Sequence, residues 1–371
     1  MQDWLSEWAA RRPPARVLHL DSAASGRPSR STLEAVAAHA WLEAEVGAYV
    51  AQERAADVLD QLRADVGALV GVPAAGVAFL ESGTTALTAL LDAWPLAPGA
   101  RIGIVPAEWG HNVEQFARHG YETQVLATDA TGRLDLAAFE HALDADPPAV
   151  VHLTHVTSQR GLVQPVEQAL AWCRAAGVPL WVDAAQAVGH VDSEIGADAV
   201  YGTSRKWLTG PRGVGFLAVA ERHWETLDVL RPRQLGDDHP PVRYLESHEA
   251  HVAGRVGLAT AVREFLAAGP ATVTARLAEV GRLTRAALAE VPGWTVVDPV
   301  DVPSAVTALR PTSGQDVPAE RVRLIAEHGI LTTAGVTARA PLDMTTPLLR
   351  VSPHVDVAPD QLARLARALA Q

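Results

Sequence analysis

"GTSRKWLTGPRGVG", residues 202–215, contains Lys206, the only lysine of the chain. The sequence has 31 lysine and arginine residues in all, so every other one is arginine. A guanidinium stays protonated at any pH that a protein meets, whereas an ammonium can lose its proton when it is buried or crowded by other cations. Only the free amine can attack a carbonyl or remove a proton from carbon. Codon bias explains the arginines but not one surviving lysine, so we predict that Lys206 is chemically required.

The residues before this stretch alternate between short apolar runs and helical stretches, beginning near residue 76. "GVAFLES" is followed by "GTTALTALLDAW", and "VPLWVDAA" leads to "DAVYGTS", which ends beside Lys206. Runs that are apolar on both faces and separated by helices predict a mostly parallel sheet covered on both sides, an α/β fold. In such sheets ligands bind beyond the carboxyl ends of the strands, so the residues after each strand form the candidate site.

The pattern changes near residue 251, where two long helical stretches precede short apolar runs and a final helix, "PDQLARLARALA". We therefore predict a large domain over residues 17–250 and a small α+β domain over residues 251–371. Residues 1–16 are expected to pack as an N-terminal arm.

The composition argues against several classes of protein. The net charge of -12 argues against binding to nucleic acid or to an anionic membrane. The single cysteine, Cys173, excludes an internal disulfide and a cysteine-rich metal site, and no metal is predicted. No apolar run approaches the roughly 18 residues of a membrane span, and the first residues lack the basic and apolar segments of a secretory signal. A cytoplasmic protein that acts on a small molecule is the expectation.

The residues that follow the predicted strands share chemistry that suits one ligand. Taken singly, each has an ordinary structural explanation, such as a helix N-cap or a buried ion pair. Together they provide amides and hydroxyls for a phosphate, a carboxylate for a basic ring nitrogen and an amine for an aldehyde. Pyridoxal phosphate carries all three groups. The residues concerned are Gly83, Thr84, Thr85, Thr203 and Arg205 for the phosphate, Asp183 for the ring nitrogen and Lys206 for the aldehyde.

Motifs along most of the chain add a resemblance. The chain contains, in order, "LHLDSAASGRPSR", "ESGTTALTALL", "PAEWGHN", "HVTSQRGLVQPV", "VDAAQAVGH", "SRKWLTGPRGVGFL" and "LLRVSPH". Together these segments resemble the class V aminotransferases, the fold-type I pyridoxal-phosphate enzymes that include the cysteine desulfurases. The resemblance implies a seven-stranded, mostly parallel sheet in the large domain, and a homodimer with active sites at the interface.

The same resemblance implies roles for individual residues. Lys206 is expected to bind the cofactor aldehyde covalently and then to remove the Cα proton of an amino-acid substrate. Asp183 is expected to keep the pyridine nitrogen protonated, and Arg350 to hold the substrate carboxylate as a bidentate pair. Further cofactor contacts are implied for Trp109, stacked on the ring, and for Gln186 and Ser158, bonded to its hydroxyl; further substrate contacts are implied for Ser22, Ala23 and Tyr49.

Departures from the family pattern bear on the reaction. Arg205 stands where relatives have a histidine, and His248 and Glu249 stand where many relatives have a Gly-Thr that reaches the neighbouring subunit. The loop from "LTTAG" to "DMTTP" has no cysteine, which a desulfurase needs to accept sulfur as a persulfide. Cys173 lies in a predicted helix and is expected to be a core residue. Persulfide chemistry is therefore not expected.

Without a thiol acceptor, a substrate deprotonated at Cα can undergo transamination, racemisation or elimination of a leaving group from Cβ. The sequence as a whole is most similar to carbon–sulfur lyases of the family that cleave a cysteine sulfoxide conjugate, so we predict β-elimination to pyruvate and ammonia. An aminotransferase or an epimerase stays open as an alternative. A non-catalytic cofactor-binding sensor or scaffold is a further one, against which the intact Lys206 and Arg350 argue. No G-x-G-x-x-G follows the first strand, so a nicotinamide enzyme is disfavoured.

Overall fold

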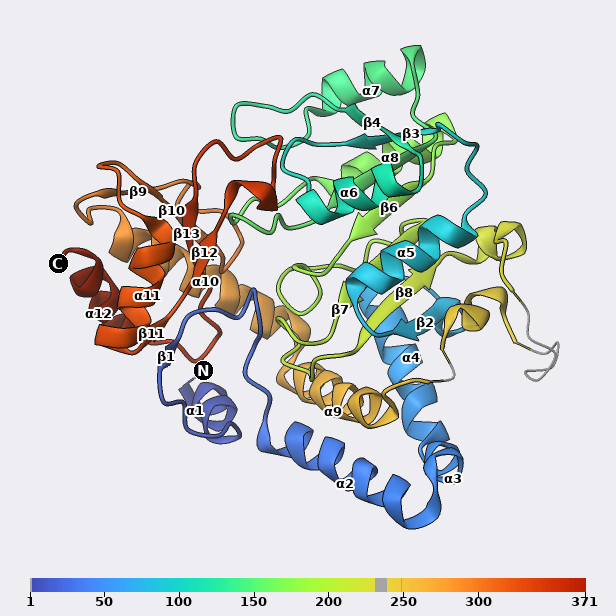
Figure 1. The fold of residues 1–371 in the computed structure, drawn as a ribbon, viewed down its shortest axis with the longest axis horizontal. Coiled ribbons are helices and arrows are strands. Elements are labelled where there is room, and N and C mark those ends of the chain that lie inside the picture. Colours follow the sequence, from blue (N-terminus) through green and yellow to red (C-terminus); the bar gives the residue numbers. More distant parts are fainter. Residues whose placement is uncertain (1, 231–238, 248) are drawn as a thin grey trace.

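A seven-stranded sheet forms the larger body of the computed structural model, which describes residues 2–230, 239–247 and 249–371 (Figure 1). Its strands are β2 (Val77–Leu80), β3 (Arg101–Ile104), β4 (Glu122–Val125), β5 (Val150–Thr154), β6 (Leu180–Asp183), β7 (Ala199–Thr203) and β8 (Gly215–Val219). They lie in the order β2-β8-β7-β6-β5-β3-β4. β8 runs antiparallel to both of its neighbours, β2 and β7, and the other neighbouring strands of this sheet are parallel. The predicted mostly parallel sheet of seven strands is confirmed.

Successive residues of these strands enter two separate apolar cores, one on each face of the sheet. Val151 and Leu153 pack in one core, whereas Val150, which lies between β3 and β6 in the sheet, packs in the other. Helices cover both faces, which is why the strands are apolar on both sides. The first core includes side chains of α4 (Ala56–Val70), α7 (Leu136–Ala145), α8 (Val166–Ala176) and α9 (Val252–Ala268), and the second includes side chains of α5 (Gly83–Ala93) and α6 (Gly110–Arg118).

A smaller lobe contains an antiparallel sheet with the order β12-β13-β10-β9. Its strands are β9 (Trp294–Val296), β10 (Thr307–Pro311), β12 (Thr333–Gly335) and β13 (Leu348–Val351), and its helices are α10 (Pro270–Leu288), α11 (Val317–His328) and α12 (Pro359–Leu369). A separate strand pair joins β1 (Leu18–His19) to β11 (Ile330–Leu331). The start of the chain is thus bound to the smaller lobe. The predicted division of the domains near residue 250 stays a prediction.

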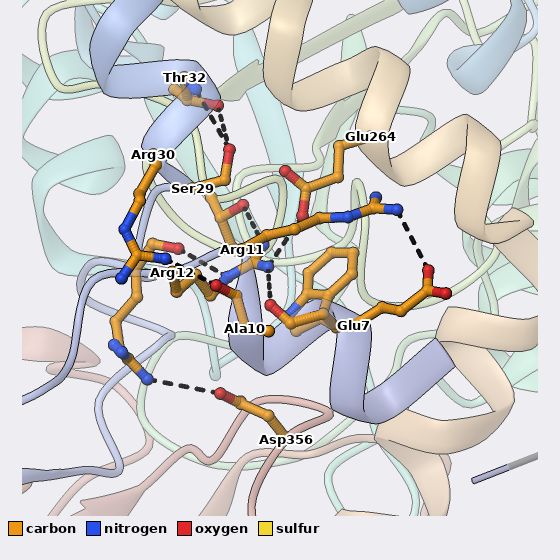
Figure 2. Close-up of polar contacts among 12 residues, drawn as sticks. Glu7, Ala10, Arg11, Arg12, Ser29, Arg30, Thr32, Glu264 and Asp356 are labelled. Atoms are coloured by element: carbon orange, nitrogen blue, oxygen red, sulfur yellow. Dashed lines mark hydrogen bonds and ion pairs between the residues drawn. The ribbon is translucent and has the colours of Figure 1, made fainter. Parts of the chain in front are cut away.

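The N-terminal helix α1 (Gln2–Ala10) is tied to the rest of the molecule through Arg12. The buried Arg12 guanidinium donates to the Trp8 carbonyl oxygen at 2.7 Å and to Glu264 Oε1, on α9, at 2.8 Å (Figure 2). It also lies over the Trp8 ring, 3.8 Å from its centroid. Arg30 bonds the Ala10 carbonyl oxygen at 2.6 Å. Because the Arg12–Glu264 pair is almost fully removed from water, salt screens it little.

A helical layer follows α1, made of α2 (Arg30–Val46) and α3 (Ala48–Arg54). Ser29 caps α2, because its hydroxyl accepts a hydrogen bond from the Thr32 amide at 3.2 Å. This layer leaves large apolar side chains in solvent, among them Trp41, 71% exposed, and Tyr49, 75% exposed. Among the described residues, none of the helices combines the length and the apolar character needed to cross a lipid bilayer.

Candidate active site

A cavity of about 290 Å³ lies at the carboxyl ends of β5, β6 and β7. A larger cavity, of about 610 Å³, lies between the N-terminal segment and α12, but it contains no lysine. The smaller cavity is the candidate site, since it holds Lys206 and lies where ligands of parallel sheets bind. Its lining includes most of the predicted site residues, which are Ala23, Gly83, Thr84, Trp109, Ser158, Asp183, Gln186, Thr203, Arg205, Lys206 and Arg350.

Lys206 provides the amine that lines this cavity. Burial lowers its pKa to about 7, helped by the positive charges of Arg205 and Arg350, while Asp183 acts in the opposite direction. Above that pH the amine is therefore largely unprotonated and can act as a nucleophile or a base. An arginine in the same place could do neither, which explains the single lysine of the sequence.

The neighbour of Lys206 fixes the loop that carries it. Trp207 is buried and its indole donates to Gln186 Oε1 at 2.9 Å. Gln186 Nε2 in turn donates to the Ala23 carbonyl oxygen at 2.8 Å. The turn around Ala23 also approaches the lysine closely, because a Cβ on Gly26 would lie 2.3 Å from the Lys206 carbonyl oxygen. Gln186 therefore positions two segments of the site, beyond its predicted contact with the cofactor.

Asp183, the last residue of β6, is held by two donors. Its Oδ1 accepts from the Ala185 amide at 2.8 Å and its Oδ2 from Asn112 Nδ2 at 3.1 Å. Asn112 Nδ2 also donates to Glu108 Oε1 at 2.8 Å. Two oriented hydrogen bonds leave the carboxylate little freedom to rotate, so it is set to pair with a cationic ring nitrogen.

Behind Asn112 lies a buried polar network centred on Glu108. His152 Nδ1 lies 2.9 Å from Glu108 Oε2, and His152 Nε2 lies 2.9 Å from the Tyr201 hydroxyl. Thr154 donates to Glu108 Oε1 at 2.6 Å. Burial by itself raises the pKa of Glu108, but His152 and the hydrogen bonds bring that pKa below its ordinary value. The network keeps a carboxylate ionised at full burial and fixes Asn112.

The first turn of α5 forms an anion-binding corner of the cavity. Ser82 caps the helix, accepting from the Thr85 amide at 3.1 Å, and Gly83 and Thr84 line the cavity. The helix can start this close to β8 only because residue 215 is glycine: a Cβ there would lie 2.3 Å from the Ser82 carbonyl carbon. Free amides and the positive end of the helix favour a phosphate at this corner.

Arg350 on β13 brings the smaller lobe into the site. Its guanidinium donates to the Ser158 carbonyl oxygen at 2.6 Å and to Asp21 Oδ1 at 3.3 Å. Burial, followed by the charge of Arg339, lowers its pKa to about 10, so it stays a cation near neutral pH. The Ser158 hydroxyl is buried and has no hydrogen-bond partner among the residues that the structure describes. It is therefore available to a ligand.

These features fit pyridoxal phosphate group by group. The α5 corner and Arg205 suit the phosphate, Asp183 suits the ring nitrogen, the unpaired Ser158 hydroxyl suits the ring hydroxyl and Lys206 suits the aldehyde. The fold and this pocket define a pyridoxal-phosphate enzyme of fold type I.

The chain belongs to the class V aminotransferase family, whose sequence pattern matches residues 18–365. It is 47% identical over 366 residues to a probable hercynylcysteine sulfoxide lyase of Mycobacterium tuberculosis, covering 98% of this chain and 92% of that protein. It is 27% identical over 383 residues to an isopenicillin N epimerase of Streptomyces clavuligerus, covering 95% and 94% of the two chains. A cysteine desulfurase of Escherichia coli has the same fold, with a TM-score of 0.85 at 20% identity over 98% of this chain and 97% of that one.

Some predicted site residues lie outside the cavity. Thr85 is turned into the first helical turn, where its hydroxyl donates to the Ser82 carbonyl oxygen at 3.1 Å. Ser22 lines the larger, N-terminal cavity, and Tyr49 lies exposed on α3. His248 lies outside the described residues, and its neighbour Glu249 is exposed.

Cys173 lies on α8, near the amino ends of β6 and β7, whereas the candidate site lies at the carboxyl ends of these strands. It lines a separate cavity together with Pro179 and Asp198, which precede β6 and β7. The thiol is fully buried, and burial raises its pKa to about 12. A thiol with this pKa forms no useful amount of thiolate, so Cys173 is unsuited to accept sulfur.

Sequence reasoning missed several residues that line or support the site. Glu108 and Asn112 stood within the quoted "PAEWGHN", and their spacing of one helical turn signals a shared partner. Thr154 ends β5 just as Asp183 ends β6, so the rule about strand ends covers it. Tyr201 and Arg339 carry no such signal, because only the fold brings them to the cavity.

Proposed function

We propose that this chain is a pyridoxal-phosphate-dependent carbon–sulfur lyase that cleaves hercynylcysteine sulfoxide. The observation that carries the proposal is 47% identity to a probable lyase of this name, continuous over 98% of the chain, combined with a cavity that has Lys206 but no thiol in its lining. The products are a sulfenic acid, on the path to ergothioneine, together with pyruvate and ammonia.

Different residues of the cavity bind the substrate and move its proton. Arg350 binds the α-carboxylate of the substrate, and Trp109 lines the same cavity. Lys206, as the free amine, removes the proton from Cα. The cofactor, when bound, withdraws the electrons left on Cα. The Cβ–S bond then breaks with its electron pair on sulfur, and the three-carbon fragment is hydrolysed to pyruvate and ammonia.

The chemistry of the leaving group favours this outcome over persulfide formation. A sulfenic acid leaves without help from a protein thiol, whereas a desulfurase needs one next to the substrate. The loop between β12 and β13 has no cysteine, and Cys173 is buried near the amino ends of β6 and β7. A second candidate, an amino-acid epimerase, is favoured only by the 27% identity to isopenicillin N epimerase.

The decisive experiment measures pyruvate release by the purified holoenzyme incubated with hercynylcysteine sulfoxide, in parallel with cysteine and simple cysteine sulfoxides. We expect rapid pyruvate from the hercynyl substrate and none from the Lys206→Ala variant. No pyruvate from a wild-type protein that carries its cofactor would refute the lyase proposal. Keto-acid acceptors and chiral chromatography of the amino acid would then test transamination and epimerisation.

A homodimer with active sites at the interface is part of the proposal. The exposed apolar side chains of α2 and α3, Trp41 and Tyr49 foremost, support it, since large apolar side chains left in solvent suit a protein contact. The predicted substrate role of Tyr49 requires such a second copy. Trp41→Glu should shift the protein toward monomer in sedimentation velocity, and an unchanged dimer would place the interface elsewhere. The cytoplasmic location expected from the sequence stays a prediction.

A further inference from the structure

The cavity holds more cationic side chains than the cofactor and one substrate carboxylate require. Among the described residues, four cations line it, namely Arg205, Lys206, Arg339 and Arg350, against a single carboxylate, Asp183. Arg205 suits the cofactor phosphate, Lys206 the cofactor aldehyde and Arg350 the α-carboxylate. Arg339 is left without an anion.

Arg339 is a partly buried cation whose guanidinium has no partner among the described residues. It ends the short helix η5 (Thr337–Arg339), in the loop that follows β12. Its Nε is buried without a hydrogen-bond partner, and its guanidinium makes no hydrogen bond or ion pair to any other described residue. Burial lowers the pKa of Arg339, with Asp21 acting in the opposite direction. Leaving a buried Nε unpaired costs free energy, so binding a ligand that supplies an anion there is favourable.

Packing fixes the position of Arg339 beside the N-terminus of α6. A Cβ on Gly110 would lie 2.1 Å from the Ala338 carbonyl oxygen, so η5 sits directly against the helix start that follows Trp109. Arg339 also lies close enough to lower the pKa of Arg350. Two guanidinium groups from different segments thus line the same cavity.

We propose that Arg339 binds a second carboxylate of the substrate, so that the enzyme selects amino acids with a carboxylate at each end. The proposal rests on the proposed function. Hercynine is the betaine of trimethylhistidine, so its cysteine sulfoxide conjugate carries the α-carboxylate for Arg350 and another carboxylate at the far end. Arginine suits this task, since its planar fork binds a carboxylate through two parallel hydrogen bonds.

A matched pair of substrates isolates this contact. One is hercynylcysteine sulfoxide, and the other is the same conjugate built on trimethylhistamine, which lacks only the far carboxylate. Pyruvate release gives kcat and KM for each substrate with the wild type, Arg339→Gln and Arg339→Lys. Arg118→Gln is the control, because Arg118 is an exposed arginine at the end of α6, outside the cavity.

We expect the ratio of kcat/KM between the two substrates to fall at least about tenfold in Arg339→Gln, mainly through KM for the hercynyl substrate. Arg339→Lys should retain part of the preference, since it keeps the charge but not the fork. Arg118→Gln should keep the wild-type ratio. An unchanged ratio in Arg339→Gln overturns the proposal. An equal fall in kcat for both substrates also overturns it, because Arg339 would then act on the shared sulfoxide.

Direct binding separates this proposal from the proposed function. If the wild type releases no pyruvate from either substrate, the lyase assignment fails, and calorimetry then tests Arg339 alone. Hercynine should bind the wild-type holoenzyme at least about tenfold more tightly than trimethylhistamine, and Arg339→Gln should lose the difference. Equal binding of the two ligands by the wild type overturns the proposal, and this measurement holds even where the variant fails to fold.

Discussion

Two groups of arginines in this molecule, one buried and one partly buried, differ in whether the chain supplies their hydrogen-bond partners. Arg63 and Arg255 share the carboxylate of Glu246, with Arg255 at 2.8 Å, and each also donates to a strand carbonyl oxygen, at 2.9 and 2.8 Å. In the candidate active site, the side chains of Arg205 and Arg339 line the cavity without a hydrogen bond to another described residue.

The difference separates structural from functional cations. A buried charge is tolerated when it is paired and hydrogen-bonded, and costs free energy when it is not. Around Glu246 the chain supplies the anion itself. In the cavity, Arg350 has Asp21 as a partner, but Arg205 and Arg339 have no anion from the described residues. We therefore propose that these two arginines bind anionic groups of the cofactor and the substrate.

Removing the reactive amine should have the largest effect on activity. We expect Lys206→Ala to lower pyruvate release by at least about 10³-fold, because no other lysine can replace it as base. Thermal unfolding should show a folded protein. A variant with more than about a tenth of wild-type activity would mean that the base lies elsewhere.

Removing the anion of the structural group should cost stability instead. Glu246→Gln leaves Arg63 and Arg255 without their charge partner, and we expect the free energy of unfolding to fall by roughly 3 kcal/mol. Urea denaturation measures this loss. Activity per folded molecule should stay near the wild-type value. A loss of activity without a loss of stability would contradict the structural role of the Arg63–Glu246–Arg255 group.

Loosening the support of Asp183 should have an intermediate effect. Asn112→Ala removes one of the two hydrogen bonds that orient the carboxylate, so we expect kcat to fall about tenfold. The stability of the protein should change less than in Glu246→Gln. An unaltered kcat would show that the Ala185 amide alone is sufficient to orient Asp183.

The smallest effect concerns the pH dependence of stability without cofactor. The pKa of Lys206 is about 7 in the folded chain and 10.5 ordinarily, so between these values the unfolded chain binds more protons and stability rises with pH. Lys206→Met lacks this dependence. Its stability advantage over the wild type should be largest at pH 7 or below and smaller near pH 9, changing by less than about 1.4 kcal/mol per pH unit. Urea denaturation of both apoproteins tests this, and an equal advantage at both pH values would contradict it.

The sequence was sufficient to predict which residues lie at the strand ends that line the candidate site. Asp183, Thr203 and Gly83 follow apolar runs whose parallel arrangement can be read from composition and spacing. The motif resemblance added Trp109 and Arg350. Both line the cavity.

Contacts between distant segments could not be predicted in the same way. Arg339 reaches the cavity because Gly110 lets η5 pack against α6, a contact across more than half of the chain. The pairing of β1 with β11 likewise joins the two ends of the sequence. Neither leaves a local pattern, because both depend on the completed packing of the smaller lobe.

The most direct test of the central claim locates the covalent bond to the cofactor. Borohydride reduction of the holoenzyme fixes a lysine–cofactor link as a stable secondary amine, and peptide mass spectrometry then finds it. We expect the pyridoxyl phosphate mass on the peptide that contains Lys206 and on no other. Its absence from that peptide in a protein that binds the cofactor would contradict the assignment of Lys206 as the cofactor's anchor.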